Sequence, residues 1–434
     1  MKLHIPLIAS LMMGSAVQAA PYCTQLLSKE SLPKKYAKLA PVYSDEASGW
    51  IFAQNQLKDR YDMKAPSLNL VQAIVDEFAK RDVPLAIVIA PPRVVIAGQD
   101  TLDATMEQQA YSVAKAQSSF DTLISQLADT GAIVSNLSDV ALSEQSIRDG
   151  FYYRRDTHWT TVGSAVSAIA VANAVNAHMP DLFPNDGTLA FEDLAPSGSI
   201  EEKGSLTKVV SKTCGTALSP ETSVAFDLSR QGSLLGNALE GPSIALLGSS
   251  FSNRYKRDHY RFADALARAF DADVENYSVS GGGPIGAIEP YVLSGALDRK
   301  DHDLVIWELP YTESFNSPSF LRQLLGALSE DRPALSEVDL LPQSKSTLVK
   351  IADGTVTSGI EIVTEDVAKQ SFKLEVRFDN GSTTKVYLGR RNAVPVDMRT
   401  DSLRSSLSHF GARAPVEIVV SPLKGASIKH ITLF

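Results

Sequence analysis

Short, continuous runs of apolar residues alternate with segments of helical periodicity along the first three quarters of the chain, and this alternation constrains the fold more than any other feature. The apolar runs lie at residues 84–90, 132–134, 243–247, 273–279 and 303–307. The helical segments lie at 67–80, 110–130, 160–178, 260–270 and 284–297. Strands that are apolar along their whole length are typical of a parallel sheet covered by helices on both faces. We therefore predict an α/β fold over about residues 45–327, within a domain spanning 21–330.

Two further segments depart from this pattern. Residues 181–240 are rich in glycine, serine, proline and acidic residues and show little periodicity, so we expect a long irregular insertion within the α/β domain. In 372–378 the apolar residues alternate strictly, and the turn sequence Asp379-Asn380-Gly381 separates this run from a second one at 384–388. Such a pattern predicts a β-hairpin, to which 416–420 and 428–434 add strands. We predict a small all-β sandwich over 335–434.

The overall charge argues against one large class of function. The chain of 434 residues carries 41 basic and 50 acidic side chains, a formal net charge of −9. Proteins that bind nucleic acid in general need a basic surface that displaces counterions, so we expect no nucleic-acid partner. The hydrophobic fraction of 44% likewise excludes a disordered chain.

The N-terminus has the pattern of a secretory signal peptide. Lys2 precedes an apolar run from Ile5 to Val17, and small residues follow at the positions that a signal peptidase reads. We expect residues 1–20 to be a signal peptide cleaved near Ala19 or Ala20. The alternative, an uncleaved anchor, requires about 20 apolar residues, more than this run supplies.

The chain has two cysteines, Cys23 and Cys214. An even count in an exported protein favours a disulfide, which here ties the mature N-terminus to the middle of the chain. Two unrelated free thiols are the alternative. A metal site is disfavoured, because no histidine stands at ligand spacing from either cysteine.

A carboxylate and an imidazole stand two residues apart just before a predicted helix, as Asp156-Thr157-His158. On an extended chain this spacing points both side chains the same way. The carboxylate then accepts a hydrogen bond from one ring nitrogen and leaves the other as a base, which is the orienting half of a Ser-His-Asp triad. The same spacing suits a pair of metal ligands or a structural contact. No third ligand is evident near the pair, so we expect no metal.

A serine-rich loop follows one of the apolar runs. Gly248 is followed by three candidate nucleophiles, Ser249, Ser250 and Ser252. Nucleophiles and ligands in open α/β sheets collect at the carboxyl ends of strands, and N–H groups at a helix start can stabilise an oxyanion. Helix capping by serine is an equal alternative at this position.

A glycine block follows another apolar run. Gly281, Gly282 and Gly283 can bring backbone N–H donors close to a ligand, and a tight turn is the alternative. The block matches neither a dinucleotide site nor a P-loop, and we expect no cofactor. Glu308 ends a further apolar run and needs a partner if it is buried.

Four motifs form a set in this sequence: Asp156-x-His158-Trp159, Gly248-x-Ser250, the glycine block and Ile306-Trp307-Glu308. Together and in this order they resemble the periplasmic alginate O-acetyltransferases of the SGNH hydrolase-like superfamily. The resemblance covers nearly the whole chain. It implies an SGNH hydrolase-like parallel sheet with circularly permuted motif order, since the acid–histidine pair precedes the serine. It also implies a carbohydrate-binding module at 335–434 and a periplasmic location.

The same resemblance implies catalytic roles. Ser250 is the nucleophile, His158 is its base, and Asp156 holds His158. Ser250 forms an acetyl-enzyme, and its own N–H together with a donor from the glycine block stabilises the oxyanion. No Gly-x-Asn-Asp block is evident, so the usual asparagine donor is unassigned.

An alginate-like polymer is anionic, so cationic side chains are expected along its path. We predict substrate contacts from Arg93, Arg254, Tyr255, Arg390 and Arg391. Ordinary solvated charge is the alternative for the arginines. The expected partners are the polysaccharide and a membrane-bound protein that delivers the acetyl group, with the chain a monomer within an export complex.

Other functions fit the same residues. A polysaccharide acetyl-esterase has the same triad but gives the acetyl group to water. A non-catalytic polysaccharide-binding scaffold of an export complex keeps the fold with a vestigial triad. A metal-dependent hydrolase is the remaining alternative, and it lacks a third ligand near Asp156 and His158.

Overall fold

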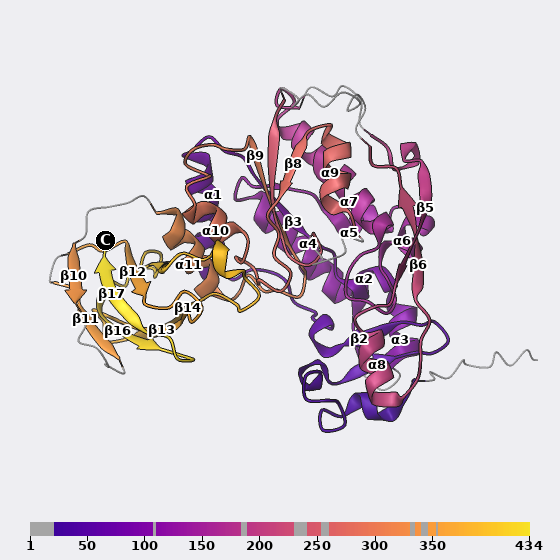
Figure 1. The fold of residues 1–434 in the computed structure, drawn as a ribbon, viewed down its shortest axis with the longest axis horizontal. Helices are drawn as coiled ribbons and strands as arrows, with labels where there is room; N and C mark the ends of the chain where they lie inside the picture. The colour runs from indigo at the N-terminus through magenta and orange to yellow at the C-terminus, as the bar shows by residue number, and fades with distance from the viewer. Residues whose placement is uncertain are drawn as a thin grey trace, which may run out of the picture.

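The structure, a computed structural model, describes residues 21–106, 110–183, 189–229, 241–252, 260–329, 335–339, 346–352 and 355–434. An α/β part and a C-terminal all-β part lie side by side along the long axis of the molecule (Figure 1). The expected signal peptide, residues 1–20, lies outside the described residues. Among the described helices, none combines the length and the apolar composition that crossing a membrane requires.

Five parallel strands form the central sheet of the α/β part, in the order β4-β3-β9-β7-β8. Their bounds are β3 (Leu85–Ile89), β4 (Ile133–Val134), β7 (Ser243–Leu247), β8 (Asp273–Asn276) and β9 (Leu304–Leu309). Every residue of β3 and β9 is buried, which is why these runs are apolar apart from Glu308. The predicted fold class is confirmed.

The strand order is that of a doubly wound sheet with a shifted start. Counted from β7, it reads 2-1-3-4-5, so the chain forms the fourth and fifth strands of this order before the first. This arrangement is the circular permutation that the motif order implies. In such sheets ligands bind outside the carboxyl ends of the strands where the order reverses, which here lies between β7 and β9.

Helices cover both faces of the sheet (Figure 1). On one face α7 (Thr161–His178) packs against α9 (Phe262–Phe270). On the face toward the all-β part lie α1 (Ala65–Ala79), α10 (Ile288–Leu293) and α11 (Pro318–Leu328). The helices between β3 and α7 are α2 (Arg93–Ala97), α3 (Gln99–Met106), α4 (Val113–Ala128), α5 (Leu137–Leu142) and α6 (Gln145–Phe151). Thr160 caps α7, because its hydroxyl accepts hydrogen bonds from the N–H groups of Val162 and Gly163.

The insertion at 181–240 is more regular than predicted. It contains an antiparallel ribbon of β5 (Pro196–Glu202) and β6 (Glu221–Phe226), with α8 (Thr207–Cys214) between them. The periodicity is weak because most of β5 is exposed, so little of it needs an apolar side chain. The predicted disulfide joins Cys23 to Cys214, with a Cα–Cα distance of 5.6 Å, and ties α8 to the N-terminal segment. A short hairpin of β1 (Val42–Ser44) and β2 (Ile51–Ala53) lies in that segment.

The C-terminal part consists of two four-stranded antiparallel sheets, β10-β17-β12-β15 and β11-β16-β13-β14. The bounds are β10 (Ser336–Asp339), β11 (Thr347–Lys350), β12 (Gly359–Thr364), β13 (Ser371–Phe378), β14 (Thr383–Gly389), β15 (Ser402–Ser406), β16 (Pro415–Pro422) and β17 (Ile428–Leu433). β13 buries every second side chain, and β13 and β14 form the predicted hairpin. Helix α11 of the α/β part packs against β14 and β15.

Candidate active site

Asp156 and His158 lie in a short loop between α6 and α7. An antiparallel bridge between Tyr152 and Trp159 closes this loop. The chain turns here instead of extending as predicted, because the His158 N–H donates to Asp156 Oδ1 at 2.9 Å. The turn still brings the two side chains together, and His158 Nδ1 lies 2.5 Å from Asp156 Oδ1.

The Asp156 carboxylate is fully buried and accepts a further hydrogen bond, at Oδ2, from the Ser205 N–H. Burial alone raises the pKa of Asp156. The charge of His158 and the hydrogen bonds from His158 and Ser205 outweigh this effect, so that the pKa lies below its ordinary value. Asp156 is therefore ionised at neutral pH and holds a proton on His158 Nδ1, which leaves Nε2 as the basic nitrogen.

The insertion supports this carboxylate through the residues that precede it. Glu221, at the start of β6, accepts hydrogen bonds from the N–H groups of Arg154 and Arg155, both at 2.8 Å. A Cβ atom on Gly204 would lie 2.3 Å from the Arg155 carbonyl oxygen, and Gly204 has a φ of +74°. Only glycine fits there, so the segment with little periodicity in the sequence positions Asp156.

Ser250 is the serine that faces His158. Its Oγ lies 2.8 Å from His158 Nε2, just past the carboxyl end of β7. The hydroxyls of Ser249 and Ser252 donate instead to Glu308, at 3.0 and 2.8 Å. Asp156, His158 and Ser250, which come from two distant stretches of the chain, thus form one hydrogen-bonded chain.

Glu308, the second-last residue of β9, holds the serine loop. Its Oε2 accepts a hydrogen bond from the Ser249 N–H at 2.7 Å. A Cβ atom on Gly248 would lie 2.6 Å from the same oxygen, so the close approach requires glycine. Burial raises the pKa of Glu308, and hydrogen bonds from Ser249 and Ser252 offset this only in part. The one sign of Glu308 in the sequence is a charge within an apolar run.

Aromatic side chains surround the imidazole. The ring of Tyr260 stacks on His158 with a centroid distance of 5.1 Å, and the ring of Phe251 lies at 4.9 Å. Trp159 is fully buried, and its indole N–H donates to the Phe251 carbonyl oxygen at 3.1 Å. This bond joins the histidine loop directly to the serine loop.

The glycine block turns beside the serine loop. The Val279 N–H donates to the Gly248 carbonyl oxygen at 3.0 Å, and the Gly282 N–H donates back to the Val279 carbonyl oxygen at 3.0 Å. Gly281 and Gly283 have φ values of +76° and +83°, a conformation that side chains disfavour. The block therefore forms a tight turn at the carboxyl edge of the sheet.

Arg93 lies inside the protein, and the prediction that it binds substrate is wrong. It is fully buried, and its guanidinium donates to the carbonyl oxygens of Ile51, Tyr153 and Arg154 at distances between 2.8 and 3.0 Å. Burial lowers the pKa of Arg93. Its contacts hold the segment that leads to Asp156, so it supports the site from within.

The two adjacent arginines of the all-β part differ. Arg390 is buried and forms an ion pair with Glu289 at 2.8 Å, so the prediction that it grips a polymer carboxylate is also wrong. The side chain of Arg391 is 52% exposed and pairs with Glu313 at 2.9 Å. It borders a cavity of about 370 Å³ between the glycine block and the all-β part, which Lys58 also lines.

Two predicted substrate contacts, Arg254 and Tyr255, lie outside the described residues. Within the described ranges, no three histidine, cysteine, aspartate or glutamate side chains gather as a metal site requires. The loops of Asp156, His158 and Ser250 bring together an ionised carboxylate, an imidazole and a serine hydroxyl.

Known proteins resemble the chain in sequence and in fold. Alginate biosynthesis protein AlgX of Pseudomonas putida is 26% identical over 379 residues, which cover 85% of this chain and 76% of that protein. Probable alginate O-acetylase AlgJ of Azotobacter vinelandii is 25% identical over 282 residues, covering 61% of this chain and 67% of that protein. The solved structure of Pseudomonas aeruginosa AlgX superposes with a TM-score of 0.68 and 19% identity, and covers 95% of this chain and 98% of that chain.

The strongest assignment comes from a family match. Residues 47–311, more than half of the chain, match the family described as an SGNH hydrolase-like domain, acetyltransferase AlgX. The matched range includes the sheet, the Asp156–His158 loop and the serine loop. The chain therefore belongs to the AlgX family of SGNH hydrolase-like acetyltransferase domains.

Proposed function

We propose that this chain is a periplasmic O-acetyltransferase that moves an acetyl group, by way of Ser250, onto hydroxyl groups of an exopolysaccharide such as alginate. The observation that carries the proposal is the hydrogen-bonded chain Asp156–His158–Ser250 at the carboxyl edge of the sheet. Relatives named alginate biosynthesis protein and probable alginate O-acetylase support the choice of group and polymer.

The reaction proceeds in two transfers of the same acetyl group. His158 Nε2 takes the proton of Ser250 as Oγ attacks the acetyl carbonyl, and Asp156 stabilises the imidazolium that forms. The donor's leaving group departs with that proton, and acetyl-Ser250 remains. A sugar hydroxyl then loses its proton to His158 and attacks the acetyl carbon. The sugar keeps the acetyl group, and His158 returns the proton to Ser250.

Each transfer passes through an oxyanion, which needs hydrogen-bond donors. The Ser250 N–H stands next to the attacking oxygen. The glycine block lies beside the serine loop, and because the Gly282 N–H already donates to Val279, we assign the second donor to Gly281 or Gly283. One such donor contributes about 3–4 kcal/mol to the stability of the transition state.

The polymer path follows the cavity of about 370 Å³ beside the glycine block. Lys58 and Arg391 line it, and each is able to contact a uronate carboxylate. Glu313, which Arg391 now contacts, gives way to that carboxylate when the polymer binds. The all-β part, with its exposed Tyr387 at the cavity wall, serves as the carbohydrate-binding module.

The location and partners follow from the N-terminal pattern and from the chemistry. We propose that residues 1–20 direct export to the periplasm and are removed near Ala19 or Ala20. A membrane-bound partner then delivers the acetyl group to Ser250. The chain works as a monomer within the export complex.

Replacing the nucleophile tests the proposal. The wild-type chain, 4-nitrophenyl acetate and an unacetylated alginate oligosaccharide are expected to give acetylated sugar, detected by mass spectrometry. Ser250→Ala should reduce the rate at least about a thousandfold, because the residual rate comes only from binding and the oxyanion donors. Ser125→Ala, which removes an exposed hydroxyl on α4, is the matched control and should retain full activity.

The products separate the alternatives. Free acetate without acetylated sugar, across a range of oligosaccharide concentrations, identifies an esterase. No turnover by the wild-type chain, combined with polymer binding that Ser250→Ala leaves unchanged, identifies a non-catalytic scaffold. Either result contradicts the proposed transferase.

A further inference from the structure

We propose that the all-β part completes the active site, because its segment 390–394 holds the glycine block in place through Arg390 and Glu289. The two residues are positioning residues rather than catalytic ones. The inference rests on the proposed function, in which the glycine block supplies an oxyanion donor. It assigns the C-terminal part a role in catalysis besides any role in binding sugar.

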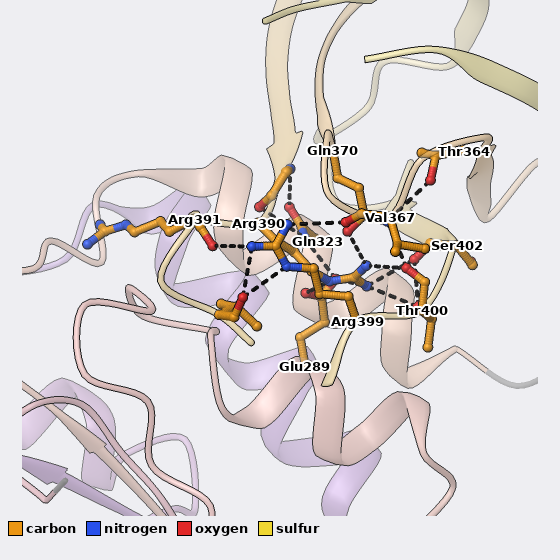
Figure 2. A network of polar contacts seen from close by, with 12 residues as sticks. Glu289, Gln323, Thr364, Val367, Gln370, Arg390, Arg391, Arg399, Thr400 and Ser402 are labelled. Carbon is orange, nitrogen blue, oxygen red and sulfur yellow. Dashed lines mark hydrogen bonds and ion pairs between the residues drawn. The ribbon is translucent and has the colours of Figure 1, made fainter. Parts of the chain in front are cut away.

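A buried ion pair joins the two parts of the molecule (Figure 2). Arg390 follows β14, and Glu289 lies in α10, which residues 284–287 connect to the glycine block. Nε and Nη2 of Arg390 donate to the two carboxylate oxygens of Glu289 at 2.8 and 3.1 Å. The side chains are 2% and 1% exposed, so water does not compete for this pair.

The surroundings of Arg390 admit one orientation of its guanidinium. Nη1 donates to Gln370 Oε1 at 2.9 Å and to the Thr400 carbonyl oxygen at 2.8 Å, and Nη2 also donates to the Ser402 carbonyl oxygen at 2.9 Å. Gln323 of α11 donates to Glu289 at 2.8 Å from the other side. Figure 2 shows these residues converging on the pair from both parts.

Glu289 is connected to the glycine block through the backbone. Its N–H donates to the Ile285 carbonyl oxygen at 3.0 Å. The chain folds so tightly here that a Cβ atom on Gly286 would lie 2.5 Å from the Gly282 carbonyl oxygen. A shift of Glu289 therefore moves the turn that contains Gly282 and Gly283.

The segment after Arg390 covers the outer side of the block. A Cβ atom on Gly283 would lie 2.5 Å from Arg391 Nε, and one on Gly281 would lie 3.2 Å from the Ala393 Cβ. Val394 is 1% exposed and packs in the hydrophobic core of the α/β part. The glycine block thus has side chains of the all-β part as its immediate neighbours.

Two further contacts make this arrangement rigid. Arg399 holds the covering segment within the all-β part, since its Nη2 donates to the carbonyl oxygens of Val394 at 2.8 Å and Arg391 at 3.2 Å. On the inner side, the Trp307 indole N–H donates to the Pro284 carbonyl oxygen at 2.8 Å. The block is therefore held between β9 and segment 390–394.

The energetics favour positioning over simple stabilisation. Burying an ion pair removes hydration from both charges, and apolar replacements of similar volume are often as stable or more stable. What a bidentate, fully desolvated pair contributes is a defined geometry. A fixed geometry matters at this place because a displacement of about 1 Å in a catalytic group can reduce a rate about a hundredfold.

The chain offers a matched control in Arg322. The side chain of this buried arginine of α11 also reaches from one part to the other, here from the α/β part to the all-β part. Its guanidinium donates to the carbonyl oxygens of Ser406 and His409 at 3.3 and 3.0 Å and lies 3.5 Å from the ring centroid of Phe410. These partners all lie in the all-β part, and none of these contacts involves the glycine block. Loss of Arg322 weakens the same interface without that connection.

The experiment compares Arg390→Lys, Glu289→Gln and Arg322→Lys in the full chain. Lysine keeps the charge of Arg390 but lacks the fork that binds both carboxylate oxygens. Turnover of 4-nitrophenyl acetate is measured well below the Tm of each variant, so that every chain is folded. We expect kcat to fall about 10- to 100-fold in the first two variants, with KM changed less than about threefold and the shape of the pH profile kept. Arg322→Lys should keep the wild-type kcat.

Hydrogen exchange supplies a readout that does not depend on activity. Peptides covering residues 277–287 should exchange about tenfold faster in Arg390→Lys and Glu289→Gln than in the wild type or Arg322→Lys. Unchanged exchange in these peptides overturns the inference whatever the turnover, and so does an equal loss of kcat in Arg322→Lys. If the wild-type chain turns over no acetyl ester, the proposed function fails, and the exchange data still decide whether the pair holds the block.

Discussion

Replacing Glu308 by glutamine separates the charge of this side chain from its shape. The carboxylate accepts hydrogen bonds from the Ser249 N–H at 2.7 Å, the Ser249 hydroxyl at 3.0 Å and the Ser252 hydroxyl at 2.8 Å. An amide with its oxygen at the Oε2 position keeps the bonds from the Ser249 N–H, from the Ser249 hydroxyl, which also lies 3.0 Å from Oε2, and from Ser252. Its NH₂ group donates to the Ser249 hydroxyl, because a hydroxyl also accepts. Glutamine therefore satisfies the same groups.

The raised pKa of Glu308 sets the sign of the pH dependence. Burial makes the folded protein bind this proton more tightly than the unfolded chain does. The free energy of unfolding therefore falls as the pH rises from the unfolded pKa through the folded pKa, by about 1.4 kcal/mol for each unit by which the two differ. Glu308→Gln has no such proton. Its stability relative to wild type should improve across the same range of pH.

Alanine gives the contrast in magnitude. Glu308→Ala leaves three buried donors without their acceptor, at about 1–3 kcal/mol each, and a cavity in addition. We expect a loss of at least about 3 kcal/mol in the free energy of unfolding. Glu308→Gln at acid pH, where glutamate is neutral like the amide, should differ from wild type by less than about 1.5 kcal/mol.

Urea unfolding, followed by tryptophan fluorescence, measures these differences at about pH 4 and about pH 8. Trp159 and Trp307 are both buried in the α/β part and report on its unfolding. The reasoning is refuted if Glu308→Gln loses stability relative to wild type as the pH rises. It is also refuted if alanine is no more destabilising than glutamine, since the three donors would then have found other partners.

Two further substitutions test the site and its support. Asp156→Asn should lower kcat for an acetyl ester about 10⁴-fold, because the amide presents a donor either to His158 or to the Ser205 N–H; a kcat within tenfold of wild type contradicts this. Because the pKa of Asp156 is lowered on folding, its stabilisation is complete above the unfolded pKa and is lost as the pH falls through the folded pKa, so the stabilities of wild type and variant should converge in acid titrations. Cys214→Ser frees residues 191 apart in the chain, and loop entropy predicts a loss of about 5 kcal/mol; an unchanged Tm in calorimetry argues against that value.

The sheet could be predicted from the sequence because burial on both faces leaves a direct mark. The run at 243–247 coincides with β7. Its side chains are largely buried, because helices cover both faces of the sheet. The ribbon of β5 and β6 leaves no such mark, because its side chains are largely exposed and its contacts with Arg154 and Arg155 use the backbone and one carboxylate. Segments whose work is done by backbone groups are hard to recognise in a sequence.

The candidate site likewise contains residues that could be predicted from the sequence and residues that could not. The spacing of Asp156 and His158 was enough to single them out in the sequence. The choice of Ser250 over Ser249 needed the family resemblance, because the sequence does not show which of two neighbouring serine side chains points toward His158. Arg93 and Arg390 were misassigned for a related reason. An arginine bound to buried carbonyls or to a buried carboxylate has the same appearance in a sequence as one that awaits a ligand.

The permuted strand order also governs how this chain is able to fold. β3 and β4 are synthesised first, but the next neighbour of β3 in the sheet is β9, which begins at Leu304, 215 residues after β3 ends at Ile89. Until that strand arrives, an apolar strand edge lacks its partner, and such edges pair with other chains. Long-range parallel pairing of this kind is slow. During this time the open edge of β3 is available to other chains, so we expect aggregation during refolding to compete with the arrival of β9.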